Sequence, residues 1–130
     1  MTAQTLQPPG WPRPRGYANG MAGTGRLVVT AGVVGWDAQG QFPAGMAAQC
    51  DQAFANIVAI LAEAGAEPQH LVRLTWYVTS RASYLAEGAE IGAAYRRRFG
   101  RNFPAMAVVE VSALMEEAAL VEIEATALVP

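Results

Sequence analysis

Four short stretches of the chain are rich in apolar residues, many of them β-branched, and each predicts a β-strand. They span residues 26–35, 70–79, 105–112 and 120–129. In the second, the apolar residues alternate with more polar ones, as in a strand with one buried face. Its two faces are Val72, Leu74, Trp76 and Val78 on one side, and Arg73, Thr75 and Tyr77 on the other. The last stretch sets Val121, Ile123, Ala125 and Ala127 opposite Glu122, Glu124 and Thr126.

Two longer stretches follow the helical period instead. Between residues 46 and 64 a single apolar stripe is formed by Cys50, Phe54, Ile57 and Leu61. Gly65 follows at the position where a helix commonly ends. A second helix is predicted from about Ala82 to Phe99, with Ile91, Tyr95 and Phe99 four residues apart and Gly100 closing it.

The order of these elements predicts a single α+β domain over residues 1–130, with a mixed β-sheet and two helices packed on one face. Residues 1–15 contain four prolines, so we expect an irregular arm lying on the surface. The helix-free face of the sheet is expected to carry Tyr77, Met106, Val108, Glu110, Glu122 and Thr126. This face is too apolar to leave wholly in water, which favours self-association with ligand sites between subunits.

Composition excludes several kinds of chemistry. The chain has 130 residues, is 52% hydrophobic and carries a net charge of −2, which argues against a nucleic-acid partner. All nine basic residues are arginine, so a lysine Schiff base, a pyridoxal-phosphate linkage and a P-loop are excluded. With only Cys50 and His70, a disulfide framework and a Cys/His zinc site are excluded too.

No apolar run approaches the roughly 18 residues that cross a bilayer, so we expect no membrane partner. A single unpaired cysteine and the absence of a secretory pattern near the first residue favour a cytoplasmic protein. Cys50 lies on the helix stripe and is read as a core residue, without a nearby base to make it a nucleophile.

Four segments carry a resemblance to a known family. They are Gly16-Tyr17-Ala-Asn-Gly20, then Thr30-Ala31-Gly32, then residues 56–65 running on to 72–78, and Phe103-Pro-Ala105 followed by residues 109–111 and 121–125. In this order and spacing they resemble the reactive intermediate deaminase family, the Rid or YjgF-like proteins, also labelled endoribonuclease L-PSP. The resemblance covers residues 16 to 129, almost the whole chain.

The resemblance implies a chorismate-mutase-like fold and a homotrimer whose sheets form a central β-barrel, with ligand clefts between neighbouring subunits. Family members hydrolyse reactive imines and enamines to keto acids and ammonia without a metal or organic cofactor, so the resemblance implies no metal and no cofactor here. In them an arginine directly after the Phe-Pro-Ala motif binds the substrate carboxylate. A glutamate in the last strand holds the attacking water, assisted by a tyrosine near the N-terminus and by backbone groups after the first strand.

This sequence keeps part of that pattern. Glu122 is the candidate catalytic residue, and the candidate substrate-binding residues are Tyr17, Ala31, Gly32 and Met106. Met106 stands where the carboxylate-binding arginine is expected, and Ala31 stands where deaminating members carry a serine. A thioether cannot pair with a carboxylate, so either Met106 adapts the cleft to a less anionic or more hydrophobic ligand, or the site is lost and Met106 fills space. Replacement cations are available in Arg73, Arg26 and the run Arg96 to Arg98.

Two functions follow from this pattern. The first is an enzyme that deaminates a reactive imine, an enamine or a related small amino-compound of the 2-aminomuconate kind. The second is a trimer that holds a small metabolite in the same clefts without chemistry. Glu122 fits a catalytic carboxylate and a solvated one equally well, and Tyr17 fits a ligand-binding hydroxyl and a packing aromatic ring equally well. These two residues therefore do not decide between the two functions. A guanidinium within reach of the Met106 cleft would favour the enzyme.

Overall fold

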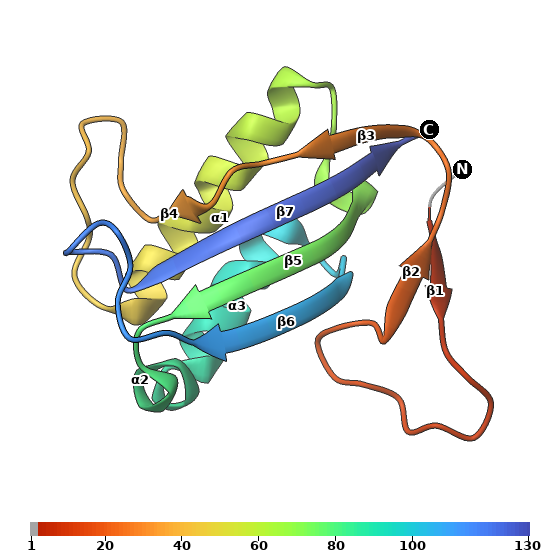
Figure 1. Cartoon of the computed structure of the whole chain (residues 1–130), viewed down its shortest axis with the longest axis horizontal. Coiled ribbons are helices and arrows are strands. Elements are labelled where there is room, and N and C mark those ends of the chain that lie inside the picture. Colours follow the sequence, from red (N-terminus) through yellow and green to blue (C-terminus); the bar gives the residue numbers. More distant parts are fainter. Residues whose placement is uncertain (1–2) are drawn as a thin grey trace.

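A five-stranded mixed sheet with helices on one face makes up most of the described chain, residues 3–130 of the computed structural model (Figure 1). Its central strands are β7 (Val121–Val129) and β5 (Leu71–Val78), which run antiparallel. β6 (Ala105–Glu110) pairs parallel to β5 at one edge. At the other edge, β3 (Arg26–Val29) and β4 (Val33–Val34) both pair antiparallel to β7. This arrangement confirms the predicted fold class.

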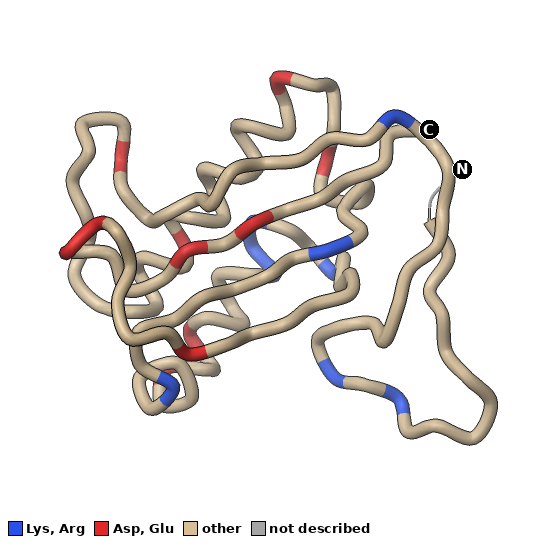
Figure 2. Tube along the Cα trace, in the orientation of Figure 1, with Lys and Arg blue, Asp and Glu red and all other residues tan. Residues whose placement is uncertain are grey.

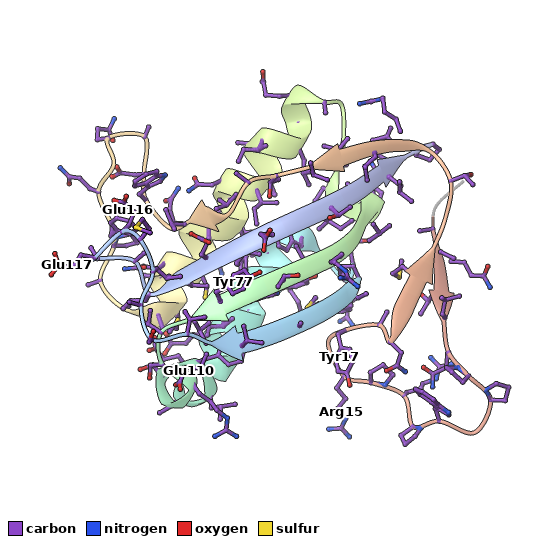
Figure 3. All side chains as sticks on the ribbon, viewed as in Figure 1. Arg15, Tyr17, Tyr77, Glu110, Glu116 and Glu117 are labelled. Atoms are coloured by element: carbon purple, nitrogen blue, oxygen red, sulfur yellow. The ribbon has the colours of Figure 1, made fainter. Side chains whose placement is uncertain are left out.

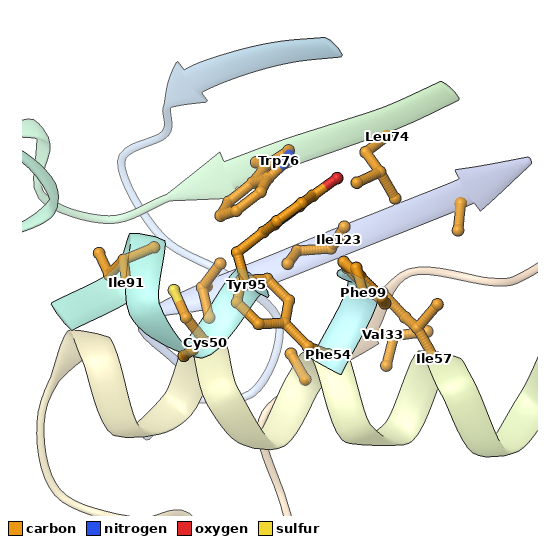
Figure 4. Close-up of a cluster of buried hydrophobic side chains, with 14 of the residues drawn as sticks. Val33, Cys50, Phe54, Ile57, Leu74, Trp76, Ile91, Tyr95, Phe99 and Ile123 are labelled. Carbon is orange, nitrogen blue, oxygen red and sulfur yellow. The ribbon is translucent and has the colours of Figure 1, made fainter. Parts of the chain in front are cut away.

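The helices cover one face of this sheet. They are α1 (Met46–Glu63), α2 (Arg81–Ala86) and α3 (Gly88–Phe99), with a short 3-10 turn at Pro68–His70. The predicted stripe of α1 is fully buried, and Phe54 packs edge-on against both Trp76 and Tyr95 (Figure 4). Cys50 is fully buried, which confirms it as a core residue, and this burial raises the pKa of its thiol to about 12. Among residues 3–130, no helix has both the length and the apolar character to cross a membrane.

The strand predicted at 26–35 is divided in two. Thr30 interrupts it, because its hydroxyl accepts a hydrogen bond from the N–H of Ala125 at 3.0 Å, in place of a backbone carbonyl. Pairing with β7 resumes only at Val33, which leaves Ala31 and Gly32 in a short bend between β3 and β4.

The helix predicted from 82 to 99 is also divided. α2 begins at Arg81, capped by the Ser80 side chain, and ends before Glu87, whose ψ of 17° departs from helical geometry. The Glu87 carboxylate accepts a hydrogen bond of 3.1 Å from the N–H of Ala47, in the first turn of α1. The second layer of the described chain therefore contains three α-helices, and the Glu87 side chain at the break between α2 and α3 satisfies an N–H group in the first turn of α1.

The N-terminal arm is more regular than predicted. β1 (Gln4–Leu6) pairs antiparallel with β2 (Gly20–Ala22). The four prolines of the arm all lie between these strands, so their missing N–H groups do not disturb the ladder. Residues 7–19 form the loop between the two strands, and Met1 and Thr2 lie outside the described residues.

The helix-free face differs from the prediction on β6. In the parallel register, Met106, Val108 and Glu110 stand beside Leu74, Trp76 and Val78, so they share the helix-covered side. The helix-free face of β6 carries Ala105, Ala107 and Val109 instead. The prediction went wrong because residues 105–109 are apolar at every position, which leaves the phase of the alternation undetermined. Tyr77, Glu122 and Thr126 lie on the helix-free face as predicted.

Candidate functional site

A cavity of about 390 Å³ opens at the β6 edge of the sheet, on its helix-covered side. We call it the Met106 cavity. It is lined by Met106, Trp76 and Phe103 from the sheet side, by Tyr84, Leu85, Gly88, Ile91, Gly92, Tyr95 and Arg96 from the α2–α3 segment, and by Arg15 and Gly16 from the N-terminal loop. The loop is fixed there by a 3.0 Å hydrogen bond from the N–H of Ala18 to the carbonyl of Pro104.

Two arginines line this cavity. In the basic run at the end of α3, Arg98 donates to the Asp51 carboxylate at 2.9 Å and Arg97 lies 3.1 Å from it. These contacts, led by the Arg98 hydrogen bond, lower the pKa of Asp51. Arg96 instead lines the Met106 cavity, together with Arg15. Neither of the two forms an ion pair within residues 3–130, and no Asp or Glu there lines the cavity.

A second group of candidate residues lies at the β4 end of the sheet. Glu122 pairs with Val34, two residues after Gly32. Gly32 touches the Glu122 carboxylate so closely that a Cβ added to it would lie 2.6 Å from Oε2. Tyr77 stands beside Glu122 on the same face and donates a hydrogen bond of 2.5 Å from its hydroxyl to Glu124 Oε1. This bond, together with the charges of Glu124 and Glu122, raises the pKa of Tyr77.

Ala31 and Gly32 also line a more open hollow of about 490 Å³ against α1. Its polar rim includes Asn56, whose side-chain amide donates to the carbonyls of Val34 and Trp36 at 3.0 and 2.8 Å. β4 and the residues directly after it, next to Ala31 and Gly32, are therefore held to α1 by the Asn56 side chain.

The candidate residues thus form two groups within one chain. Glu122, Gly32 and Ala31 lie near β4, with Glu122 on the helix-free face. Met106 lies at the start of β6 on the other face, and half-exposed Tyr17 lies in the loop beside it. Figure 3 shows Tyr17 and Arg15 close to the start of β6, away from β4 in Figure 1. The structure therefore does not bring Met106 and Glu122 together in a single subunit.

Of the candidate replacement cations, only one lies at the Met106 cavity. Arg26 donates a 2.7 Å hydrogen bond to the carbonyl of Ala64 and so caps the end of α1. Arg73 lies on the helix-free face, level with Ala105 and Thr126. Arg96 alone of the predicted set reaches the cavity. Arg15 was not predicted, because only the folding of the loop against Pro104 places it there.

The two groups offer different chemistry. A carboxylate such as Glu122 can accept a proton from water, while the arginines of the Met106 cavity can bind an anion. No cluster of three or more His, Cys, Asp or Glu side chains suited to a metal ion occurs among residues 3–130.

Comparison with known proteins gives one consistent result. Residues 12–129 match the family model described as endoribonuclease L-PSP. A RutC family protein from Haemophilus influenzae is 36% identical over 104 residues, which cover 79% of each chain. The structure of YyfB, of the conserved Rid protein family from Yersinia pestis, aligns with a TM-score of 0.83, at 35% identity and over 99% of this chain and all of that one. The structure of E. coli TdcF with bound serine aligns with a TM-score of 0.70 at 27% identity, over 100% of this chain and 99% of that one.

Proposed function

Because this chain belongs to the endoribonuclease L-PSP family, whose relatives include RutC and Rid proteins, we propose that it hydrolyses a reactive imine or enamine to a carbonyl compound and ammonia. We further propose that the reaction takes place in clefts shared by neighbouring subunits of a homotrimer. The free Cys50 suits a reducing compartment, so we assign this activity to the cytoplasm.

The argument for a shared cleft is geometric. Met106 and Glu122 lie on opposite faces of one sheet, and the sheet separates them. If both serve one ligand, as the resemblance implies, then each cleft must take its Met106 cavity from one subunit and its Glu122 from the next. The helix-free face that carries Glu122 is also the face that needs a partner, because Leu27 and Val29 on it are more than 60% exposed.

Within such a cleft Glu122 would act as the general base. With the imine in its protonated iminium form, the Glu122 carboxylate takes a proton from water as the water oxygen bonds to the imine carbon, and the C=N electron pair moves to nitrogen, giving a neutral amine. Glu122 then gives that proton to the amine nitrogen, the C–N bond breaks and ammonia leaves, and Glu122 takes the hydroxyl proton as the carbonyl forms and releases it to solvent. Tyr17 and the Gly32 backbone would orient the substrate, with Ala31 beside them and Met106 as an apolar wall.

One observation favours a working site over a lost one: Arg15 and Arg96 line the Met106 cavity, and no Asp or Glu from residues 3–130 lines it. An arginine at this cavity can supply the carboxylate anchor that the enzyme needs and that Met106 cannot provide. The serine bound to TdcF shows that a relative accepts a molecule of amino-acid type. The second candidate, a trimer that binds a metabolite without chemistry, is favoured by the thioether of Met106.

Ammonia release from freshly generated imino acids tests the proposal. We expect the wild type to accelerate release and Glu122→Ala to reduce kcat/KM at least 100-fold, in the range of general-base removal. Glu124→Ala is the matched control, because it removes a carboxylate two residues along the same strand and face. Met106→Arg reports on the anchor and should gain activity toward small imino acids. Wild-type release no faster than the uncatalysed rate would favour the binding trimer instead.

A further inference from the structure

Two surface loops at opposite ends of the molecule have complementary charge and exposed apolar side chains. One is the N-terminal loop, residues 7–19, and the other is residues 112–119, which we call the acidic loop. We propose that the N-terminal loop of one subunit binds the acidic loop of a second copy of this chain, with Trp11 packed against Met115. The inference rests on the proposed function in one respect, the order in which neighbouring subunits share a cleft.

Charge is divided between the two ends of the sequence. Residues 1–36 contain three arginines and no acidic residue, whereas residues 102–130 contain five glutamates and no basic residue. Two of these arginines lie in the N-terminal loop and two of the glutamates lie in the acidic loop, and none of the four side chains forms an ion pair within residues 3–130. These four are Arg13, Arg15, Glu116 and Glu117. The two loops therefore carry opposite charge that the single chain leaves unpaired.

Within one chain the two loops cannot meet, because they lie at opposite ends of β6. The N-terminal loop is bridged to Ala105, where β6 begins, and the acidic loop follows Glu110, where β6 ends. A strand of six residues keeps the two loops roughly 20 Å apart. Figure 3 accordingly shows Arg15 well separated from Glu116 and Glu117. Contact between the two loops therefore requires a second copy of the chain.

Each loop also exposes a large apolar side chain next to its charge. Met115 is 95% exposed and Trp11 is 59% exposed. Both residue types are enriched at protein interfaces, and a methionine sulfur packs favourably against an aromatic ring. Two arginines follow Trp11 closely in the sequence and two glutamates follow Met115, so each loop has an apolar anchor beside its charged residues. Tryptophan and arginine are also the residues that most often dominate binding energy at an interface.

The N-terminal loop is held in a fixed shape before any partner binds. The Gln7 side-chain amide donates to the carbonyls of Trp11 and Pro12, at 3.0 and 3.3 Å. The same side chain accepts a 3.0 Å hydrogen bond from Asn19 Nδ2, at the other end of the loop. A loop ordered in this way loses little further conformational entropy on binding, which favours association.

The acidic loop is fixed at its base. Gln49, which is buried in α1, donates to the carbonyl of Ala118 at 3.0 Å and accepts from the N–H of Leu120 at 2.7 Å. The loop is therefore attached to the core while Met115 at its tip faces solvent. A second molecule can cover Met115 without rearranging the loop's attachment.

The proposed shared cleft brings these two loops together. The N-terminal loop supplies Arg15 and Gly16 to the Met106 cavity, and the acidic loop leads into β7, whose second residue is Glu122. A cleft that joins the cavity of one subunit to Glu122 of the next therefore sets the N-terminal loop beside the neighbour's acidic loop. Because the two surfaces differ, the contact is head-to-tail, the kind that generates closed rings.

Cross-linking through introduced cysteines tests the contact directly. The double variant Pro12→Cys/Ala113→Cys places a thiol in each loop and keeps Trp11 and Met115. Native Cys50 does not react, because it is fully buried. After treatment with a short bis-maleimide, a denaturing gel should show linked species up to about 41 kDa, three times the 13.7 kDa chain. Each single-cysteine variant is the matched control and should stay at 13.7 kDa, because position 12 meets position 113 of the neighbour.

Exchange of charge between the loops gives a second readout that leaves the apolar anchors unchanged. Arg13→Glu with Arg15→Glu sets like charges against one another, so the chain concentration at which half of the trimers dissociate should rise at least about tenfold in sedimentation. Adding Glu116→Arg and Glu117→Arg should restore it toward the wild-type value.

The matched control for this rescue adds Glu63→Arg and Glu90→Arg instead. These two glutamates are exposed in the helix layer, so the net charge is the same but the acidic loop is unchanged. This control should not restore the trimer. Equal rescue by the two pairs, or linked species that form as readily in the single-cysteine variants, would overturn the inference.

Two outcomes separate this inference from the proposed function. Linked trimers of the double-cysteine variant, with no ammonia release by the wild type, would support the loop contact and refute the hydrolysis. Ammonia release by a wild-type trimer whose double-cysteine variant does not cross-link would support the hydrolysis and refute the loop contact.

Discussion

Gly32 is the residue on which the position of Glu122 depends most directly. The space that a side chain at position 32 would occupy is filled by the Glu122 carboxylate, with Oε2, Cδ and Cγ at 2.6, 2.7 and 3.0 Å from the added Cβ. A glycine there lets the carboxylate lie against the backbone of the β3–β4 bend. Any larger residue has to push the carboxylate away.

We therefore expect Gly32→Ala to reduce activity far more than stability. The obstructing atoms belong to the end of a flexible side chain, so the free energy of unfolding should fall by about 1 kcal/mol or less. If Glu122 positions the water, kcat/KM should fall at least tenfold because its carboxylate is displaced. Thermal unfolding and ammonia release on the same sample measure the two effects.

Gly35→Ala is the contrasting variant. A Cβ at Gly35 would overlap the backbone carbonyl of Gln49 in α1, which cannot move aside as a side chain can. We expect this variant to lose several kcal/mol of stability, in the range of severe steric overpacking. Unchanged kcat/KM in Gly32→Ala would show that the contact with Glu122 has no catalytic role.

Single residues of the site were predictable only where the local pattern was decisive. Glu122 could be placed because residues 121–127 alternate strictly between apolar and polar positions. The side of the sheet occupied by Met106 could not, because the parallel pairing with β5 decides it and the local sequence is apolar throughout. Arg15 was out of reach for the same kind of reason, since a hydrogen bond to a residue about 90 positions away fixes its loop.

At the scale of elements, α1 and α3 are joined at their surface by Asp51 with Arg97 and Arg98. The two arginines lie in the last turn of α3, where positive charge is also favoured by the helix dipole. Their contacts hold the pKa of Asp51 below its ordinary value of 3.8. A carboxylate whose pKa is lower in the folded chain stabilises the fold above the unfolded-state pKa and loses that contribution as the pH falls through the folded-state pKa.

We expect Asp51→Asn to lower the melting temperature slightly at neutral pH and to flatten its decline below about pH 4. Exposed ion pairs contribute ~0.2–1 kcal/mol, so the neutral effect is small and should shrink further in high salt. Calorimetry between pH 7 and pH 2 measures both. Glu63→Gln, in the same helix and without an ion pair in residues 3–130, serves as the control. An acid decline as steep in Asp51→Asn as in the wild type would contradict the assignment.

Elements were more predictable than their interruptions. α1 ends one residue from its predicted position, because its apolar stripe and Gly65 are local signals. At each break, a side chain accepts a hydrogen bond from a backbone N–H far away in the sequence. Thr30 bonds to Ala125, and Glu87 bonds to Ala47. No local pattern contains that information.

For the whole molecule, the main feature is the helix-free sheet face. Leu27, Val29 and Val109 on this face are 64%, 62% and 43% exposed. Figure 2 shows acidic positions in the first half of β7, while the basic positions of the N-terminal loop lie on the opposite side of the picture. A trimer would cover these apolar residues. If it also brings the N-terminal loop and Met106 cavity of one subunit to β4 and Glu122 of the next, it assembles the two halves of the proposed cleft.

This arrangement predicts that two inactive variants restore activity when they share a trimer. Sedimentation equilibrium should first give a mass of about 41 kDa, three times the 13.7 kDa chain. Glu122→Ala keeps its cavity, and Gly92→Phe keeps its Glu122 but fills the Met106 cavity with a ring. When the two variants are co-refolded in equal amounts, about one quarter of wild-type activity should be recovered. Half of the clefts receive an intact cavity, and half of those receive an intact Glu122 from the neighbouring subunit.

The control for this recovery is a mixture of the same variants without refolding, in which the preformed trimers do not exchange and no activity should return. A 13.7 kDa mass would contradict the trimer, and with it the shared cleft. A trimer whose co-refolded mixture stays inactive would contradict the shared cleft alone, because a cleft within one subunit has no intact copy in either variant. Recovery near one quarter would place the Glu122 and the Met106 cavity of each cleft on neighbouring subunits, as expected if the two groups, on opposite faces of the sheet, serve one ligand.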